Sequence, residues 1–137
     1  MSLLRLALGI NGALMLAWSP VLFFSHKSII GTVEGRKVAA NKTKFDVMIW
    51  RITGLWVAFT GLTCLFVTDI PSAFWSSRYG FSADSLQVLW SPLACLVAAT
   101  HAVETVVKFE ALGPGVLKGA SGNIFLGTIA AGALLFG

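Results

Sequence analysis

The sequence carries little charge. Only 12% of its 137 residues are Asp, Glu, Lys or Arg, whereas 56% are hydrophobic. Because a typical soluble domain has about twice that charged fraction, the composition excludes an ordinary water-soluble protein. The chain also has only two cysteines and two histidines. With no metal-ligand spacing among them, these residues favour neither a disulfide framework nor a metal site.

The apolar residues are gathered into long runs instead of being dispersed. The runs cover about 3–24, 47–68, 86–107 and 117–136. A helix of about 20 apolar residues crosses the ~30 Å hydrocarbon core of a bilayer. The sequence therefore predicts an all-α fold: an integral membrane four-helix bundle with antiparallel up-down spans, forming a single membrane domain over residues 1–137.

The first and last runs differ in character. The first is predicted to be a retained span and not a signal peptide, because it is long and Trp18-Ser19-Pro20-Val21 is a poor cleavage site. The fourth starts between Leu117 and Ile124 and is rich in Gly and Ala, which is typical of a helix that packs against others. Gly54, in the second run, predicts similar close packing.

Basic residues are distributed unevenly between the two sides of this bundle. Four spans put the segments 25–46 and 108–123 on one side and both termini on the other. The first segment holds most of the cations outside the spans: Lys27, Arg36, Lys37, Lys42 and Lys44. The positive-inside rule therefore predicts that both segments face the cytosol, matrix or stroma. Such a loop attracts anionic membrane lipids or an acidic partner protein, and it needs no nucleic acid to explain it.

Three ionisable residues lie within the second and third predicted spans: Arg51, His101 and Glu104. A charge at mid-span costs about 2.5–3.5 kcal/mol on insertion scales, so each needs an explanation. Arg51 and Glu104 lie about one turn from the same membrane face on antiparallel helices, and His101 lies one turn deeper than Glu104. We therefore expect a structural polar cluster of these three residues. In the alternative, Arg51 extends to the headgroups and Glu104 pairs with Lys108.

Little in the spans indicates catalysis. Beyond these three residues the polar groups are few, and His101-x-x-Glu104 lacks the second histidine of a helical zinc-protease motif. The sequence predicts no catalytic residue and no metal. A bound lipid is the cofactor most compatible with it; His101 as a ligand of chlorophyll or haem competes with the commoner structural role of a histidine. An alternative is a small lipid-modifying membrane enzyme with His101 and Glu104 as proton carriers.

Several of these residues also occur in a family pattern. The pattern comprises Arg51-Ile52-Thr53-Gly54-Leu55-Trp56, Cys64, Thr68-Asp69-Ile70, and His101 with a nearby glutamate. It resembles the ergosterol biosynthetic protein twenty-eight family. The order and length of the runs and the turn at Gly113-Pro114-Gly115 extend the resemblance loosely over most of the chain, although its specific part is short.

The resemblance implies a role as well as a fold. Members of that family are small four-span proteins of the endoplasmic reticulum that hold the enzymes of sterol C-4 demethylation together and have no known active site. It thus implies a non-catalytic scaffold within a larger membrane protein assembly, with the structural signature Arg51, Gly54, Trp56, His101 and Glu104. An accessory subunit of a respiratory or photosynthetic complex, in the mitochondrial inner or thylakoid membrane, is the alternative for a protein of this shape.

Overall fold

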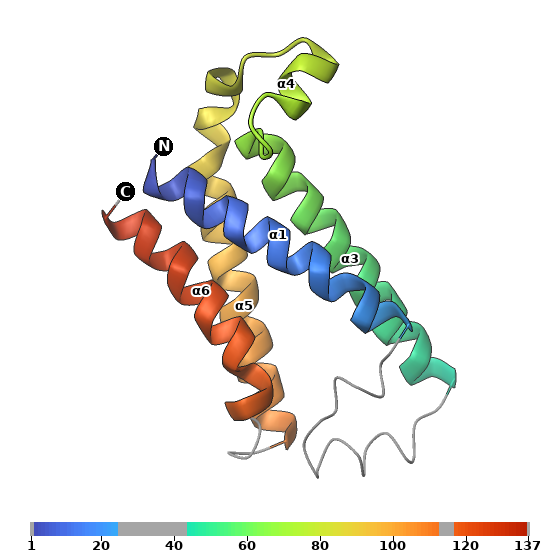
Figure 1. Ribbon diagram of the computed structural model, residues 1–137. Coiled ribbons are helices and arrows are strands. Elements are labelled where there is room, and N and C mark those ends of the chain that lie inside the picture. Colours follow the sequence, from blue (N-terminus) through green and yellow to red (C-terminus); the bar gives the residue numbers. More distant parts are fainter. Residues whose placement is uncertain (1, 25–43, 113–116, 137) are drawn as a thin grey trace.

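The computed structural model describes residues 2–24, 44–112 and 117–136, and these residues are helical apart from short connections (Figure 1). The elements in chain order are α1 (Leu3–Phe24), α3 (Lys44–Thr68), α4 (Phe74–Tyr79), the 3₁₀ helix η1 (Ala83–Leu89), α5 (Trp90–Leu112) and α6 (Leu117–Phe136). The described residues contain no strand. The all-α class predicted from the sequence is therefore confirmed.

Three segments are long and apolar enough to cross a membrane: Leu3–Phe24, Val47–Thr68 and Asp84–Val107. The apolar part of the last helix is shorter and covers Ser121–Phe136. These segments agree with the prediction of an integral membrane protein. The third segment begins as η1 and becomes α-helical only at Trp90. Pro92 explains this change, because proline has no N–H to donate and its ring collides with the carbonyl four residues earlier in a continuous α-helix.

The closest helix packing is between α1 and α3, which run antiparallel (Figure 1). Contacting residues recur every seven positions along both helices: Arg5 with Thr68, Gly12 with Gly61, and Ser19 with Gly54. A seven-residue repeat keeps one side of each helix facing the other, as in a coiled coil. The α1–α3 pair is thus fixed by small residues and short polar contacts along its whole length.

Glycine is required at the centre of this pair. A Cβ atom on Gly61 would lie 2.9 Å from the Gly12 carbonyl oxygen, and one on Gly12 would lie 2.9 Å from the Gly61 carbonyl oxygen. A Cβ on Gly54 would lie 3.1 Å from the Phe23 backbone nitrogen. The prediction from sequence that Gly54 serves close packing agrees with this geometry.

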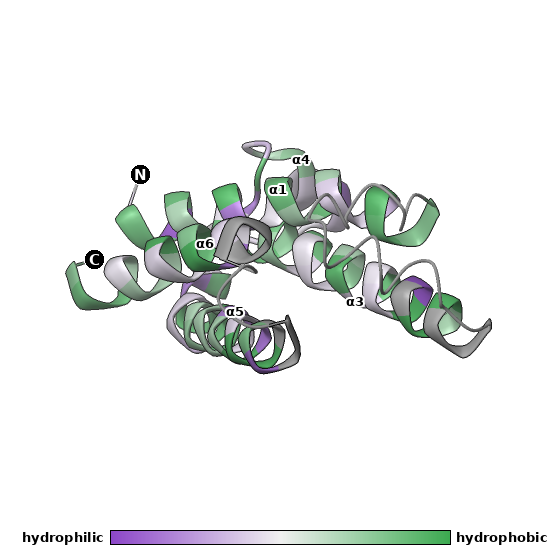
Figure 2. Ribbon diagram, turned by 90° about the horizontal axis from the view of Figure 1, so that it is seen from below, coloured by the Kyte–Doolittle hydropathy of each residue, from purple (hydrophilic) through white to green (hydrophobic). Residues whose placement is uncertain are grey.

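Helices α5 and α6 form a second pair, and α1 packs across it (Figure 1). The largest buried cluster lies where all four long helices meet; its members are Leu8, Cys64, Val67, Trp90, Ala94, Val97 and Ala130. Trp90 brings the start of α5 against the end of α3 there. From that junction α3 and α5 diverge towards Lys44 and Leu112, as the two views in Figures 1 and 2 show. The molecule is therefore two helix pairs joined at one end, and not a bundle of parallel cylinders.

Candidate functional site

The carboxyl end of α3 is a junction where several elements bond to the same stretch of backbone. Arg5 of α1 donates from Nε to the Thr68 carbonyl oxygen at 2.7 Å and from Nη2 to the Asp69 carbonyl oxygen at 3.3 Å. Trp90 of α5 donates from Nε1 to the Val67 carbonyl oxygen at 2.9 Å. The last carbonyls of a helix have no partner within the helix and carry its negative dipole end. A guanidinium and an indole N–H satisfy them here.

The α3 backbone itself completes this end. Asp69 adopts the left-handed conformation, with φ of 49°. Its N–H donates to the Phe66 carbonyl at 3.1 Å, and the Ile70 N–H donates to the Leu65 carbonyl at 2.9 Å. These two bonds form a Schellman motif, a common way to end a helix. The Ile70 side chain then packs on Gly9 of α1, which joins the end of α3 to α1 a second time.

The Asp69 carboxylate organises the segment that follows. Its Oδ1 accepts hydrogen bonds from the backbone N–H groups of Trp75 and Ser76 at 2.9 and 3.0 Å. Its Oδ2 accepts from the Ala73 N–H at 3.0 Å and the Ser76 hydroxyl at 2.7 Å. Burial alone raises the pKa of Asp69, but these four hydrogen bonds outweigh it and hold the pKa below its ordinary value. The carboxylate thus caps the start of α4 as an anion.

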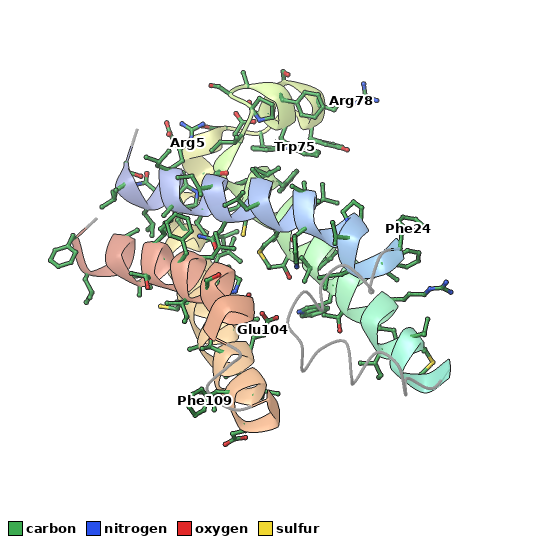
Figure 3. All side chains as sticks on the ribbon, turned by 60° about the horizontal axis from the view of Figure 1, so that its bottom comes forward. Arg5, Phe24, Trp75, Arg78, Glu104 and Phe109 are labelled. Atoms are coloured by element: carbon green, nitrogen blue, oxygen red, sulfur yellow. The ribbon has the colours of Figure 1, made fainter. Side chains whose placement is uncertain are left out.

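Aromatic rings attach α4 to α3. The Phe66 ring centroid lies 5.7 Å from that of Trp75, 6.0 Å from that of Tyr79 and 5.1 Å from that of Phe81. Trp75 also donates from Nε1 to the Ile70 carbonyl oxygen at 3.0 Å. Aromatic residues with a polar edge are enriched where a membrane meets water. Figure 3 shows Trp75 and Arg78 together at this end of the molecule.

A second cluster of polar side chains lies between α5 and α6. Glu104 Oε2 accepts a hydrogen bond from Asn123 Nδ2 at 2.8 Å and lies 3.8 Å from His101 Nδ1. His101 is only 4% exposed, and neither of its ring nitrogens has a hydrogen-bond partner among the described residues. Its Cβ lies 3.2 Å from where a Cβ on Gly127 of α6 would be. Glycine at that position lets the imidazole lie between the two helices.

Asn11 joins α1 to the same region. The side chain is fully buried, and Nδ2 donates to the Ala7 carbonyl at 3.0 Å and, at a long 3.4 Å, to the Leu126 carbonyl of α6. Its Oδ1 has no hydrogen-bond partner among the described groups. Leu126 precedes Gly127, against which His101 packs. The interior between α1, α5 and α6 therefore holds polar atoms whose hydrogen bonds are incomplete, and such atoms usually cost about 1–3 kcal/mol each.

The predicted three-residue cluster is wrong in one member. The structure brings His101 and Glu104 together, but Arg51 lies elsewhere, with its guanidinium carbon 5.7 Å from the centroid of the Phe23 ring. Figure 3 shows Phe24, at the same end of α1, well apart from Glu104. The physical reason is the divergence of α3 from α5. Arg51 and Glu104 are on opposite sides of the widening gap between the helix pairs, because α3 packs on α1 along its length.

The remaining predicted residues lie in different places. Trp56 does not enter the core: its side chain is 61% exposed on the outer face of α3, with its ring 6.2 Å from that of Phe59. Lys44 begins α3. The other residues predicted for the basic loop, Lys27, Arg36, Lys37 and Lys42, lie outside the described part of the chain. Cys64 is buried in the core, whereas Cys95 is exposed.

Comparison with known proteins adds no relative. No protein-family model matches the chain, and neither a curated protein nor a solved structure matches it at a level that indicates relationship. The residues that matter in this fold are therefore identified by their geometry alone.

Sequence reasoning missed the residues that join the helices. No role is predicted for Arg5 from the sequence, and Asp69 is included only as part of a resemblance. Asn11 and Asn123 were not assigned partners. One signal was available: Arg5, Gly12 and Ser19 are spaced by seven, as are Gly54, Gly61 and Thr68. This spacing on two neighbouring spans predicts an antiparallel pair in that register.

Proposed function

We propose that this chain is a four-span, non-catalytic scaffold or accessory subunit that stabilises a larger membrane protein assembly. The observation that carries the proposal is the use made of polar side chains in and next to the spans. Arg5 and Ser19 of α1 and Trp90 of α5 each donate to a backbone carbonyl of α3. Hydrogen bonds of this kind between helices fix the relative positions of the helices. A scaffold needs such fixed positions because it presents its outer faces to other proteins.

The outer face of α3 is the surface we assign to a partner. Its large apolar side chains follow helical spacing and are 45–64% exposed: Trp56, Phe59 and Leu62. Figure 2 shows hydrophobic residues along all the long helices. Aromatic residues are enriched in the cores of protein interfaces. The pair Trp56 and Phe59 distinguishes this face from the exposed valines of α5, Val103, Val106 and Val107.

The topology of the proposal includes α6 as a fourth crossing. This helix has 20 residues, which at 1.5 Å per residue gives about 30 Å, enough for the hydrocarbon core. Both ends of the chain and α4 then lie on one side, and the segments 25–43 and 113–116 lie on the other. We place the segments 25–46 and 108–123, which contain these connections, in the cytosol, matrix or stroma because of their lysines and arginines. The resemblance noted above supports the endoplasmic reticulum and a sterol-related assembly.

The test is copurification. The tagged chain is isolated from its native membrane in a mild detergent, and the proteins that accompany it are identified by mass spectrometry. A Trp56→Ala/Phe59→Ala variant should lose the partners, while a Val103→Ala/Val106→Ala variant, which changes an equally exposed face of α5, should keep them. Both variants should melt at the wild-type temperature, since none of these side chains is buried. Retention of every partner by the α3 variant would refute the assignment.

A lipid-modifying enzyme is the second candidate, favoured by buried His101 beside Glu104, because its ring nitrogens have no hydrogen-bond partner among the described residues. A proton carrier needs a nitrogen free to bond a substrate. His101→Gln separates the two candidates: an enzyme would lose turnover with its assembly intact, whereas a scaffold would keep the function of the assembly as long as the fold survived. Turnover and the function of the assembly are measured in a membrane extract before and after each variant is added.

A further inference from the structure

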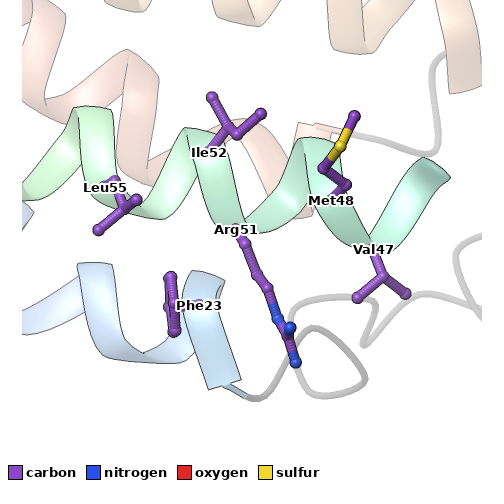
Figure 4. A pocket seen from close by; sticks show the side chains of 6 residues that line it. All are labelled: Phe23, Val47, Met48, Arg51, Ile52 and Leu55. Atoms are coloured by element: carbon purple, nitrogen blue, oxygen red, sulfur yellow. The ribbon is translucent and has the colours of Figure 1, made fainter. Parts of the chain in front are cut away.

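A groove opens between the last turn of α1 and the first turns of α3, with a volume of about 400 Å³. Its lining residues are Phe23, Val47, Met48, Arg51, Ile52 and Leu55 (Figure 4). All but one of these side chains are apolar. The volume falls in the range of about 300–1,000 Å³ that small-molecule sites occupy.

The one charged residue is oriented along the groove. Figure 4 shows the Arg51 side chain extending past the Phe23 ring towards the end of α1, with the guanidinium at its tip. The guanidinium carbon lies 5.7 Å from the ring centroid, within range of a cation–π interaction. Among the described residues, no carboxylate lies within ion-pair distance of it. Stacking on a ring orients a guanidinium while leaving its N–H groups available for an anion.

The depth of Arg51 also fits an anionic headgroup. The apolar segment begins at Val47, so Arg51 lies about 6 Å along the helix from that end, at 1.5 Å per residue. A long arginine side chain at this depth reaches the level of lipid headgroups while its methylenes stay in the apolar region. The groove then continues from the charge towards the hydrocarbon along Ile52 and Leu55.

We propose that this groove binds one anionic phospholipid, with the phosphate against Arg51 and part of an acyl chain along Met48, Ile52 and Leu55. The apolar walls disfavour a free soluble anion, because such a ligand would leave them exposed. The described lining residues include no acid, so the choline or ammonium group of a zwitterionic lipid would find no partner there. A net negative lipid complements the single positive charge. This inference depends on the membrane class of the protein and not on its role as a scaffold.

Native mass spectrometry of the full chain, released from detergent after titration with phosphatidylglycerol or phosphatidylcholine of identical chains, tests the proposal. The wild type should retain phosphatidylglycerol in preference to phosphatidylcholine. Arg51→Gln should lower that preference about fivefold, the effect of one cation near an anionic headgroup. Arg51→Lys should restore part of it, because lysine keeps the charge but loses the planar geometry. Arg78→Gln is the matched control, since Arg78 is exposed on α4 at the far end of the molecule.

The groove itself needs a separate variant. Ile52→Trp, at a half-exposed position, fills it and should reduce retention of both lipids without lowering the melting temperature. Equal retention of the two lipids by the wild type would overturn the proposal, as would an unchanged preference in Arg51→Gln or an equal loss in Arg78→Gln. A dimer whose formation depends on Arg51 would show instead that a second copy fills the groove.

Discussion

Gly61 offers the sharpest test of how α1 and α3 fit together. A Cβ atom at this position would lie 2.9 Å from the Gly12 carbonyl oxygen, 3.1 Å from Leu16 Cγ and 3.2 Å from the Leu16 backbone nitrogen. Two of these three atoms belong to the α1 backbone and cannot rotate away. Gly61→Ala must therefore push the two helices apart, although alanine itself favours a helix.

The size of the effect follows from two opposing terms. Overpacking a close contact costs about 1–3 kcal/mol, and replacing a glycine in a helix by alanine contributes about 0.5–1 kcal/mol of stability. We expect a net loss of about 1–2 kcal/mol for Gly61→Ala. Gly132→Ala is the matched control, because a Cβ there would meet nothing within 4 Å. It should gain up to about 1 kcal/mol, so the two variants should melt on opposite sides of the wild type.

The chain provides its own reporter for this measurement. Cys64 is fully buried one turn from Gly61, and Cys95 is exposed. In a Cys95→Ser background, a dye that fluoresces on reaction with a thiol reports the temperature at which Cys64 becomes accessible in detergent. The Gly61→Ala curve should shift down by about 4–8 °C. A melting temperature at or above that of Gly132→Ala would refute the contact between the two backbones.

Three further predictions use the same thermal assay. Arg5→Gln should cost about 1.5–3 kcal/mol, because charge-assisted hydrogen bonds to the end of α3 are lost, whereas Arg51→Gln, at an exposed side chain, should change stability by less than about 0.5 kcal/mol. Asp69→Asn should remove a pH dependence: the wild type keeps the contribution of this carboxylate above about pH 3.9 and loses it as the pH falls through the lowered pKa of Asp69. A double-mutant cycle of Glu104→Ala and Asn123→Ala, each of which removes the hydrogen bond, should show a coupling of about 0.6–1.7 kcal/mol.

Each of these three predictions would be contradicted by a specific result. If Arg5→Gln and Arg51→Gln were equally harmless, the end of α3 would not depend on the guanidinium. A wild type and an Asp69→Asn variant that lose stability in parallel on acidification would mean that this carboxylate does not cap α4. Additive effects in the double-mutant cycle would place Glu104 and Asn123 out of contact.

The sequence determined the class of the protein and the positions of its long helices. Hydrocarbon-length apolar runs leave the backbone no alternative in lipid to bonding within a helix, so the runs at 3–24 and 47–68 correspond to helical segments of the structure. The third apolar run in the sequence starts at residue 86, whereas the α-helix begins at Trp90, just before Pro92. Properties that depend on one segment of chain and its solvent need no knowledge of the rest.

Only the tertiary structure decided which helices pair, and hence which charges meet. Arg51 and Glu104 lie at matched depths in the membrane. An ion pair between them also requires that α3 and α5 pack side by side along their length, which they do not. Close approach of α1 and α3 at Gly12 and Gly61 gains many small van der Waals contacts, and together they outweigh one ion pair. That packing turns α3 away from α5, leaves Arg51 beside Phe23, and leaves Glu104 to His101 and Asn123.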